Sequence, residues 1–196
     1  MQTEVEAKFL NVNHNQLRKK LKELRAVCKR PVTVMRRQNF DYQDSQLEQK
    51  GGWIRVRDEG DKVTLAYKQL NDRTLHGTAE VNMVVNNFDI AVEFLLAIGM
   101  KRTSYQETKR ESWQLGDIEI ELDEWPWIKP FVEIEASTEK KLRLISKNLG
   151  LDWKKVLHGS VEIAYTAEYK MTEPEVNAIS QLRFGPVPNW LEARRK

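Results

Sequence analysis

Polar and apolar residues alternate along several stretches of the chain, and this alternation predicts β-strands. In Thr3–Phe9 the charged residues Glu4, Glu6 and Lys8 are separated by single apolar residues. Because alternate side chains of a strand point to opposite faces, these three charges share one face. The same pattern predicts further strands at Val32–Tyr42, Trp53–Arg57, Lys62–Leu70, Thr78–Val85, Ser104–Leu115, Asp117–Glu124 and Phe131–Ala136.

Other stretches have the spacing of an amphipathic helix, with apolar residues three or four positions apart. Helices are predicted at Asn13–Ala26, Asn87–Ile98 and Ser137–Leu149, and the first residue of each can cap it. Gly99 and Gly150 are placed to end the second and the third. The pattern as a whole predicts consecutive antiparallel strands with helices between them.

The C-terminal part of the chain gives weaker signals. We expect Pro31 to end the first helical region, and we expect a shorter helix at Val161–Lys170. The tail from Met171 contains three prolines and a basic end, which is typical of a surface appendage. We therefore expect one domain over residues 1–170 and a C-terminal extension over residues 171–196.

Composition narrows the class of protein. The chain has 196 residues, of which 40% are hydrophobic and 31% charged, and this favours a water-soluble domain with its own core. A net charge of +3 gives no reason to expect nucleic acid as the main ligand. Cys28 is the only cysteine, which excludes an internal disulfide and a cysteine metal site. Without an apolar span or a signal peptide, we expect a cytoplasmic protein that binds no membrane, of open oligomeric state.

The charges on the predicted strands are segregated by sign. Carboxylates occur as Glu-x-Glu at Glu4/Glu6 and at Glu133/Glu135. Cations occur at Lys8, Arg55, Arg57, Lys68 and Arg110. In an ordinary edge strand or an open sheet, these charged faces would simply lie in water. A closed barrel with its charged face inward would need a polyanion for the cations and a metal for the carboxylates. A linear triphosphate with Mg²⁺ or Mn²⁺ supplies both.

The order of these motifs resembles that of the CYTH superfamily, the triphosphate tunnel metalloenzymes. The N-terminal signature ExExK of that family is similar to Glu4-x-Glu6-x-Lys8. Later motifs of the family resemble, in order, the segments WIRVR, LAYK, AEVN, KRESW and LDEWPWIKPFVEIE. The resemblance covers residues 1–169.

The resemblance implies a fold, a cofactor and a set of site residues. The implied fold is α+β, an eight-stranded antiparallel β-barrel that forms a triphosphate tunnel, with helices packed outside. The implied ligands of Mg²⁺ or Mn²⁺ are Glu4, Glu6, Glu133 and Glu135. The implied phosphate-binding residues are Lys8, Arg55, Arg57, Lys68 and Arg110. Catalytic roles are implied for Glu4, Glu6 and Lys8, and supporting roles for Glu80, Asp123 and Glu121.

Among the departures from the family pattern, two bear on how a triphosphate would be bound. Thr108 stands where relatives often carry a lysine, and Asn82 replaces the second acid of the motif that begins at Glu80. A threonine can donate one hydrogen bond but carries no charge. We therefore expect weaker binding of a triphosphate than in relatives that have the lysine. We expect Thr108→Lys to raise the affinity for tripolyphosphate, unless Lys109 or another base takes the place of the missing cation.

Three functions remain open at this point. The first is metal-dependent hydrolysis of an inorganic or organic triphosphate. The second is a class IV adenylate cyclase that converts ATP into cyclic AMP and pyrophosphate, and the third is a non-catalytic module that binds triphosphate or polyphosphate. The expected ligands are small molecules such as ATP, thiamine triphosphate or tripolyphosphate. The residues that could stack on an organic group, or pack in the core instead, are Trp53, Trp113, Trp125 and Trp127.

Overall fold

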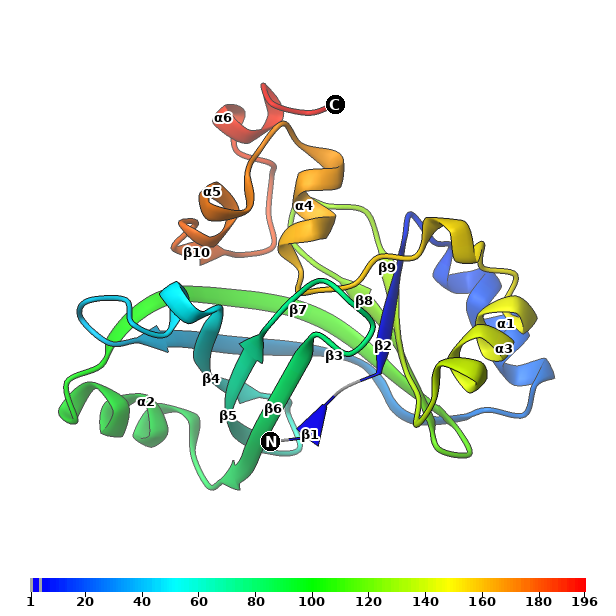
Figure 1. Ribbon diagram of the computed structural model, residues 1–196, viewed down its shortest axis with the longest axis horizontal. Coiled ribbons are helices and arrows are strands. Elements are labelled where there is room, and N and C mark those ends of the chain that lie inside the picture. Colours follow the sequence, from blue (N-terminus) through cyan, green and yellow to red (C-terminus); the bar gives the residue numbers. More distant parts are fainter. Residues whose placement is uncertain (1, 4) are drawn as a thin grey trace.

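The structure is a computed structural model that describes residues 2–3 and 5–196 (Figure 1). It shows one long curled β-sheet with helices on its outside. The strands are β1 (Gln2–Thr3), β2 (Glu6–Leu10), β3 (Val27–Asp41), β4 (Gly52–Asp58), β5 (Val63–Leu70), β6 (Thr78–Val85), β7 (Lys101–Leu115), β8 (Ile118–Glu124), β9 (Phe131–Glu135) and β10 (Gln181–Leu182).

The helices are short and are capped by side chains at their N-termini where the sequence provides them. They are α1 (His14–Glu23), α2 (Phe88–Ala97), α3 (Glu139–Asn148), α4 (Glu162–Glu168), α5 (Glu173–Asn177) and α6 (Asn189–Glu192), with 3-10 turns at Glu48–Lys50 and Trp153–Lys155. Asn13 and Asn87 cap α1 and α2 as predicted. The predicted cap of α3 was wrong by one residue, because Thr138 rather than Ser137 accepts the hydrogen bond of the first turn. None of the described helices is long and apolar enough to cross a lipid bilayer.

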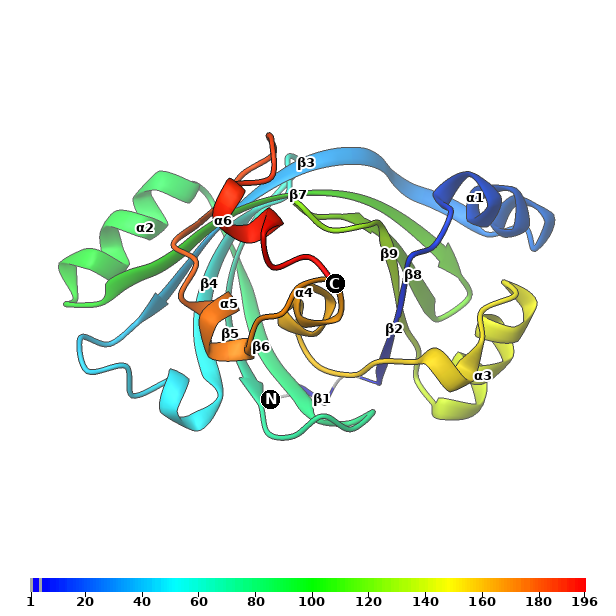
Figure 2. The ribbon, with the colours of Figure 1, turned by 90° about the horizontal axis from the view of Figure 1, so that it is seen from above.

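The curled sheet has a strand from the N-terminal part of the chain at each of its two ends. Its strand order is β1-β6-β5-β4-β3-β7-β8-β9-β2, and these neighbours are antiparallel. β1 pairs with β6 at one end and β2 pairs with β9 at the other, so the stretch predicted as one strand is divided in two (Figure 2). This confirms the predicted α+β class with an antiparallel sheet and helices outside, and the sheet that was predicted as a barrel is a half-barrel.

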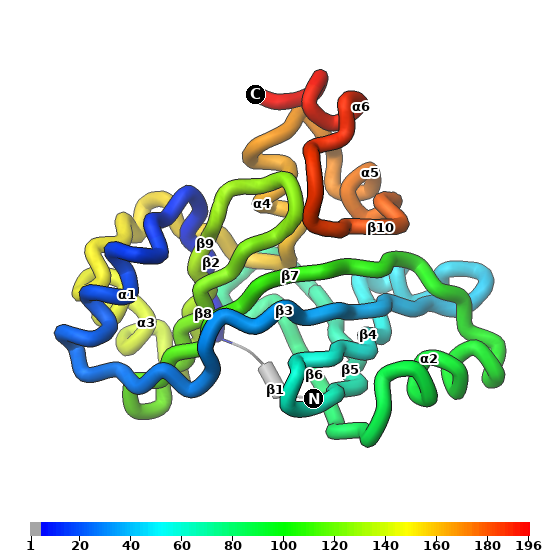
Figure 3. The backbone as a smooth tube through the Cα atoms, turned by 180° about the vertical axis from the view of Figure 1, so that it is seen from behind, coloured from blue at the N-terminus to red at the C-terminus, as the bar shows by residue number. Residues whose placement is uncertain are grey.

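The two longest strands form the back of the half-barrel, where Figure 3 shows β3 and β7 side by side. The first helix ends at Glu23, and Pro31 lies inside β3 instead of ending the helical region. The pairing of β3 with β7 shifts register between Cys28 and Arg30 and again between Arg30 and Thr33. A proline has no N–H to donate, so an irregular part of the ladder accommodates it.

The apolar faces of the strands point outward and are covered by helices. Ala7 and Phe9 of β2 pack with Leu17 of α1 and with Leu142 and Ile145 of α3 in one buried cluster. α2 covers β3 and β4 in a second cluster, which contains Phe40, Val56, Phe88, Val92 and Leu95. Because strand side chains alternate, this outward core leaves the charged residues on the inner face of the half-barrel.

The C-terminal residues gather over one end of the half-barrel (Figure 1). Val176, Leu182 and Leu191 share a third apolar cluster with Tyr165 and Tyr169 of the preceding segment. β10 pairs in parallel with β7, which ties this region to the long strands of the sheet. The division of the chain at residue 170 stays a prediction.

Candidate active site

Strand register brings the predicted acidic residues together on the inner face. In the β2–β9 pair, Glu6 lies opposite Glu135 and Lys8 lies opposite Glu133. In the β8–β9 pair, Glu133 lies opposite Glu121. Residues that are directly opposite in neighbouring strands share a face, so these five side chains belong to one inner row.

Lys8 lies between two of these carboxylates. Its Nζ atom is 3.1 Å from Glu6 and 3.1 Å from Glu133, and the lysine is 4% exposed. Burial raises the pKa of Glu6 to about 8, with attraction from Lys8 opposing this shift and repulsion from Glu133 adding to it. Burial also acts to raise the pKa of Glu133, but the attraction of Lys8, helped by Arg110, outweighs it and holds this pKa well below its usual range. One lysine therefore balances only one of the two buried acids.

The donor atoms of this acidic row fit a hard divalent cation. Glu6 and Glu133 offer carboxylate oxygens, which Mg²⁺ and Mn²⁺ prefer, and Glu135 lies in register with Glu6. Glu4, the fourth predicted ligand, lies outside the described residues. Within residues 2–3 and 5–196, no three acidic, histidine or cysteine side chains are already arranged as a metal site. The chemistry of the residues thus suits the predicted metal, and a ligand set of Glu4, Glu6, Glu133 and Glu135 stays a prediction.

Arg110 of β7 is held by acids on the same wall. Its Nε and Nη2 atoms each donate to Asp123 at 2.7 Å, and Nη2 also donates to Glu133 at 3.0 Å. Asp123 is completely buried, while Glu121 lies 3.9 Å from Arg110 and accepts from Ser112 at 2.7 Å. Asp123 and Glu121 therefore both lie next to Arg110, and their supporting roles stay a prediction.

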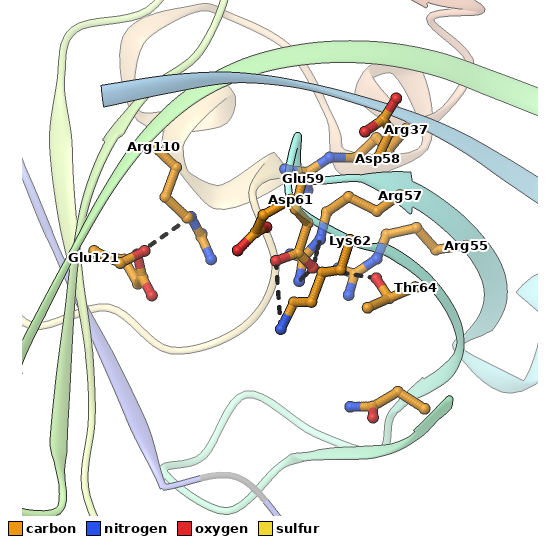
Figure 4. Close-up of polar contacts among 12 residues, drawn as sticks. Arg37, Arg55, Arg57, Asp58, Glu59, Asp61, Lys62, Thr64, Arg110 and Glu121 are labelled. Atoms are coloured by element: carbon orange, nitrogen blue, oxygen red, sulfur yellow. Dashed lines mark hydrogen bonds and ion pairs between the residues drawn. The ribbon is translucent and has the colours of Figure 1, made fainter. Parts of the chain in front are cut away.

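The facing wall carries the predicted cations Arg55, Arg57 and Lys68, and Figure 4 labels the first two. Glu80 lies 2.8 Å from Lys68 and 3.6 Å from Arg55, so it holds both of them. Asn82 donates to the Glu80 carboxylate at 3.1 Å. Asn82 therefore orients the one acid of this motif instead of supplying a second.

Arg57, also on the facing wall, is paired with a carboxylate that the sequence pattern did not indicate. Its Nε atom donates at 2.9 Å to Glu59, which lies in the turn between β4 and β5 and also accepts from Thr64 and Arg30. Burial acts to raise the pKa of Glu59, but the attraction and hydrogen bond of Arg57 outweigh it and lower the pKa to about 2. This acid is therefore fully ionised and well balanced by cations.

A cavity of about 330 Å³ lies between the two walls. The predicted site residues that line it are Glu6, Lys8, Arg55, Lys68 and Glu133. Arg57 lies outside this lining, and Arg110 lies behind Glu133. Of the tryptophans, Trp53 and Trp125 line the cavity, whereas Trp113 packs in the outer core and Trp127 against the C-terminal cluster.

Sequence reasoning missed several residues that line the cavity, among them Arg37 of β3. Arg37 is 5% exposed, its Nη2 atom donates to Thr108 at 2.9 Å, and its guanidinium lies 4.6 Å from the ring centre of Trp125. Burial lowers its pKa well below the usual value, and neighbouring arginines act in the same direction. Alternation within the predicted strand could have indicated this residue, because it places Arg37 and Asn39 on one face. However, Arg36 is adjacent, and alternation alone does not show which of the two arginines points inward.

Comparisons with known proteins agree on one fold. The family model of the CYTH domain matches residues 2–147. Similar solved structures include a candidate adenylate cyclase from Vibrio parahaemolyticus, with 17% identity, 84% of this chain and 98% of that chain covered, and a TM-score of 0.73. A protein from Pyrococcus horikoshii is also similar, with 22% identity and a TM-score of 0.66. The match covers 78% of this chain and 93% of that chain.

A third structure links the fold to an activity in another organism. It is a candidate adenylyl cyclase from Hippeastrum that is described as having a dominant triphosphatase activity. The identity is 13%, 82% of this chain and 92% of that chain are covered, and the TM-score is 0.51. No curated protein matches the sequence significantly. At these identities, the likeness to the solved structures concerns the fold.

Proposed function

The chain belongs to the CYTH family, and on this basis we propose that it hydrolyses a triphosphate with the help of a divalent metal ion. The main observation behind the proposal is that acidic and basic side chains line the same cavity. Glu6 and Glu133 line it together with Lys8, Arg55 and Lys68. A triphosphate matches the cations, and a hard metal ion matches the acids.

The descriptions of two proteins with a similar fold also support a triphosphate as the substrate. An adenylate cyclase acts on ATP, and a triphosphatase acts on a triphosphate by definition. The Vibrio parahaemolyticus and Hippeastrum proteins carry these two descriptions. A triphosphate is the ligand that the two activities have in common, which is why we choose it for this chain.

In the proposed reaction, water attacks the terminal phosphorus and the bond from that phosphorus to the leaving diphosphate oxygen breaks. Lys8, Arg55 and Lys68 bind the non-bridging oxygens and neutralise the charge that moves onto the leaving group. Glu6 and Glu133, with Glu135 and the predicted ligand Glu4, would hold the metal ion. A bound Mg²⁺ or Mn²⁺ supplies a lower pKa for the attacking water and additional positive charge at the phosphates.

Burial makes these contacts stronger than they would be at a surface. Lys8 is 4% exposed and Arg55 is 7% exposed, so both act in surroundings that contain little water. Charges interact more strongly in such a low-dielectric site, and fixed cations need no reorganisation when charge develops. The hydrogen bonds that Arg110 donates to Asp123 hold this further cation beside Glu133.

A second candidate function is the formation of cyclic AMP and pyrophosphate from ATP. It is favoured by the apolar and amide groups that line the cavity beside the cations, which suit a nucleobase. These are Trp53, Trp125 and Asn39, and among the described residues the buried Oδ1 atom of Asn39 has no hydrogen-bond partner. In this reaction, the ribose 3′-hydroxyl attacks the α-phosphorus and pyrophosphate leaves.

The products of one incubation series separate these functions. The purified protein is incubated with tripolyphosphate, thiamine triphosphate or ATP, with Mg²⁺ or Mn²⁺, and with EDTA as the control. Metal-dependent release of phosphate from at least one substrate is the expected result. Cyclic AMP and pyrophosphate from ATP would favour the cyclase instead. Binding without turnover under every condition would contradict both enzymes and leave the binding module.

A further inference from the structure

We propose that Arg37 is a further phosphate-binding residue of the cavity and that Thr108 positions it. The inference deepens the proposed function and rests on it, because the ligand is taken to be a triphosphate. Arg37 and Thr108 lie on the two long neighbouring strands β3 and β7, on the inner face. Neither residue belongs to the set that the sequence motifs indicate for phosphate binding.

The first observation is that Arg37 is buried but forms no ion pair with a described residue. Among the described residues, it forms no ion pair, and its Nε atom has no hydrogen-bond partner. Two other arginines of the strands differ in this respect, since Arg57 donates to Glu59 and Arg110 to Asp123. A buried charge without compensation is costly, so an arginine in this state points to an anion that completes the site.

The second observation is that Arg37 is fixed in place by neutral groups. Thr108 accepts the hydrogen bond from one end of the guanidinium, and Trp125 covers one face of it at 4.6 Å. Thr108 is completely buried and Trp125 is 5% exposed, so water has little access to either contact. A guanidinium held by neutral neighbours keeps its charge for a ligand, and its ordering is already achieved in the folded protein.

The third observation is the position of Arg37 among the other cations. It lines the same cavity as Lys8, Arg55 and Lys68, and it lies opposite Arg57 in the pairing of β3 with β4. Like charges this close repel one another, which the protein tolerates where a polyanion neutralises them. The phosphates of a triphosphate supply several negative charges along one short chain, which suits a row of cations.

The proposal changes the expectation for Thr108→Lys. Thr108 already contacts a cation, so a lysine there would place a second ammonium next to the Arg37 guanidinium at a fully buried position. We therefore expect Thr108→Lys alone to lower the affinity for tripolyphosphate. A lysine at position 108 should restore binding only when Arg37 is replaced by a neutral residue.

The test is a calorimetric titration of tripolyphosphate into the metal-free protein, which needs no turnover. The variants are Arg37→Gln, Thr108→Lys, the double variant, and Arg36→Gln as the matched control. Arg36 is the next residue of the same strand, but it faces outward, where it donates to Asp58 at 3.1 Å and lies over Phe88. Thermal unfolding of each variant shows whether it is folded.

We expect Arg37→Gln to raise the Kd at least about tenfold, with a melting temperature equal to or above that of the wild type. The Kd of Arg36→Gln should stay within about twofold of the wild-type Kd. The double variant with Arg37→Gln and Thr108→Lys should bind tripolyphosphate more tightly than Arg37→Gln alone. If Arg37→Gln fails to fold, Arg37→Lys, which keeps the charge, should retain binding within about fivefold. Unchanged binding by folded Arg37→Gln, or loss of binding by folded Arg37→Lys, would overturn the role of Arg37. If the wild type bound none of tripolyphosphate, thiamine triphosphate and ATP, with or without Mg²⁺, the triphosphate function itself would be overturned.

Discussion

Two glutamates inside the same half-barrel have opposite electrostatic states. Glu59, at the β4–β5 turn, has a pKa lowered to about 2, whereas Glu6, beside the cavity, has a pKa raised to about 8. Burial acts to raise the pKa of both acids. The difference arises because Glu59 receives hydrogen bonds from Arg57 and Arg30, while Glu6 shares Lys8 with Glu133.

This contrast separates ion pairs that complete the fold from charges that need a ligand. We call Arg30, Arg57, Glu59 and Thr64 the hairpin cluster, and its acid is matched by cations within the chain. We call Glu6, Lys8, Arg37 and Glu133 the cavity cluster. The cavity cluster holds an acid that keeps its proton near neutral pH and an arginine without an ion pair among the described residues. Net charge hides this difference, because each cluster contains both signs.

The largest effect is expected from Lys8, the centre of the cavity cluster. Lys8→Gln removes the cation between Glu6 and Glu133 and one contact to the phosphates, so we expect phosphate release to fall about 10²–10³-fold. Lys141→Gln is the control, since Lys141 pairs with Asp117 at an exposed site. The measurement is the initial rate with the substrate that the wild type prefers. A rate within tenfold of the wild type would remove Lys8 from the active site.

A change in the hairpin cluster should lower stability and leave binding nearly intact. Glu59→Gln leaves Arg57 and Arg30 without their common acid, and the depressed pKa corresponds to at most about 3 kcal/mol at neutral pH. Because Glu59 is ionised above pH 4.5 in both the folded and the unfolded state, this stability is fully present there and is lost as the pH falls towards 2. Urea unfolding at pH 7 and pH 3 measures the difference. A loss of tripolyphosphate affinity larger than tenfold would show that the hairpin cluster also binds ligand.

An effect of opposite sign is expected for Glu6. Its pKa is about 8 in the folded protein and 4.5 in an unperturbed glutamate, so the folded state keeps a proton that the unfolded state loses. Stability of the wild type therefore falls as the pH rises from 4.5 through 8, and Glu6→Gln avoids this loss. We expect the metal-free variant to melt at least about 2–4 °C above the wild type at pH 9, with little difference at pH 5. Equal melting temperatures of Glu6→Gln and the wild type at pH 9 would contradict the inference that Lys8 balances only one of the acids Glu6 and Glu133.

Alternation with period two is a local property, so the sequence predicted the strands and which of their residues share a face. The arrangement of these strands in the fold was implied by the resemblance to the CYTH family. The ranges Trp53–Arg57 and Thr78–Val85 occur as β4 and β6 with nearly the predicted ends. The course of β3 was less predictable, since Pro31 normally interrupts a strand and an irregular ladder accommodates it here. The third helix cap was uncertain for a similar reason, because Ser137 and Thr138 can both cap a helix.

The balance of charges in the site could not be predicted in the same way. Glu59 lies in a turn, where alternation does not indicate which way a side chain points. Its pairing with Arg57 could therefore not be predicted. Arg36 and Arg37 are adjacent, and only the register of β3 with its neighbours shows that Arg37 faces the cavity. Pairing between residues far apart in the sequence depends on the curled sheet, which local patterns do not contain.

The most direct measurement is a crystal structure of the protein with tripolyphosphate and Mn²⁺, in which anomalous scattering locates the metal. We expect Mn²⁺ bound by Glu6 and Glu133, and phosphate oxygens within hydrogen-bond distance of Lys8 and Arg37. The hairpin cluster should keep its pairing between Arg57 and Glu59. Mn²⁺ and phosphates bound outside the cavity, with Arg37 turned away from them, would contradict the proposed site.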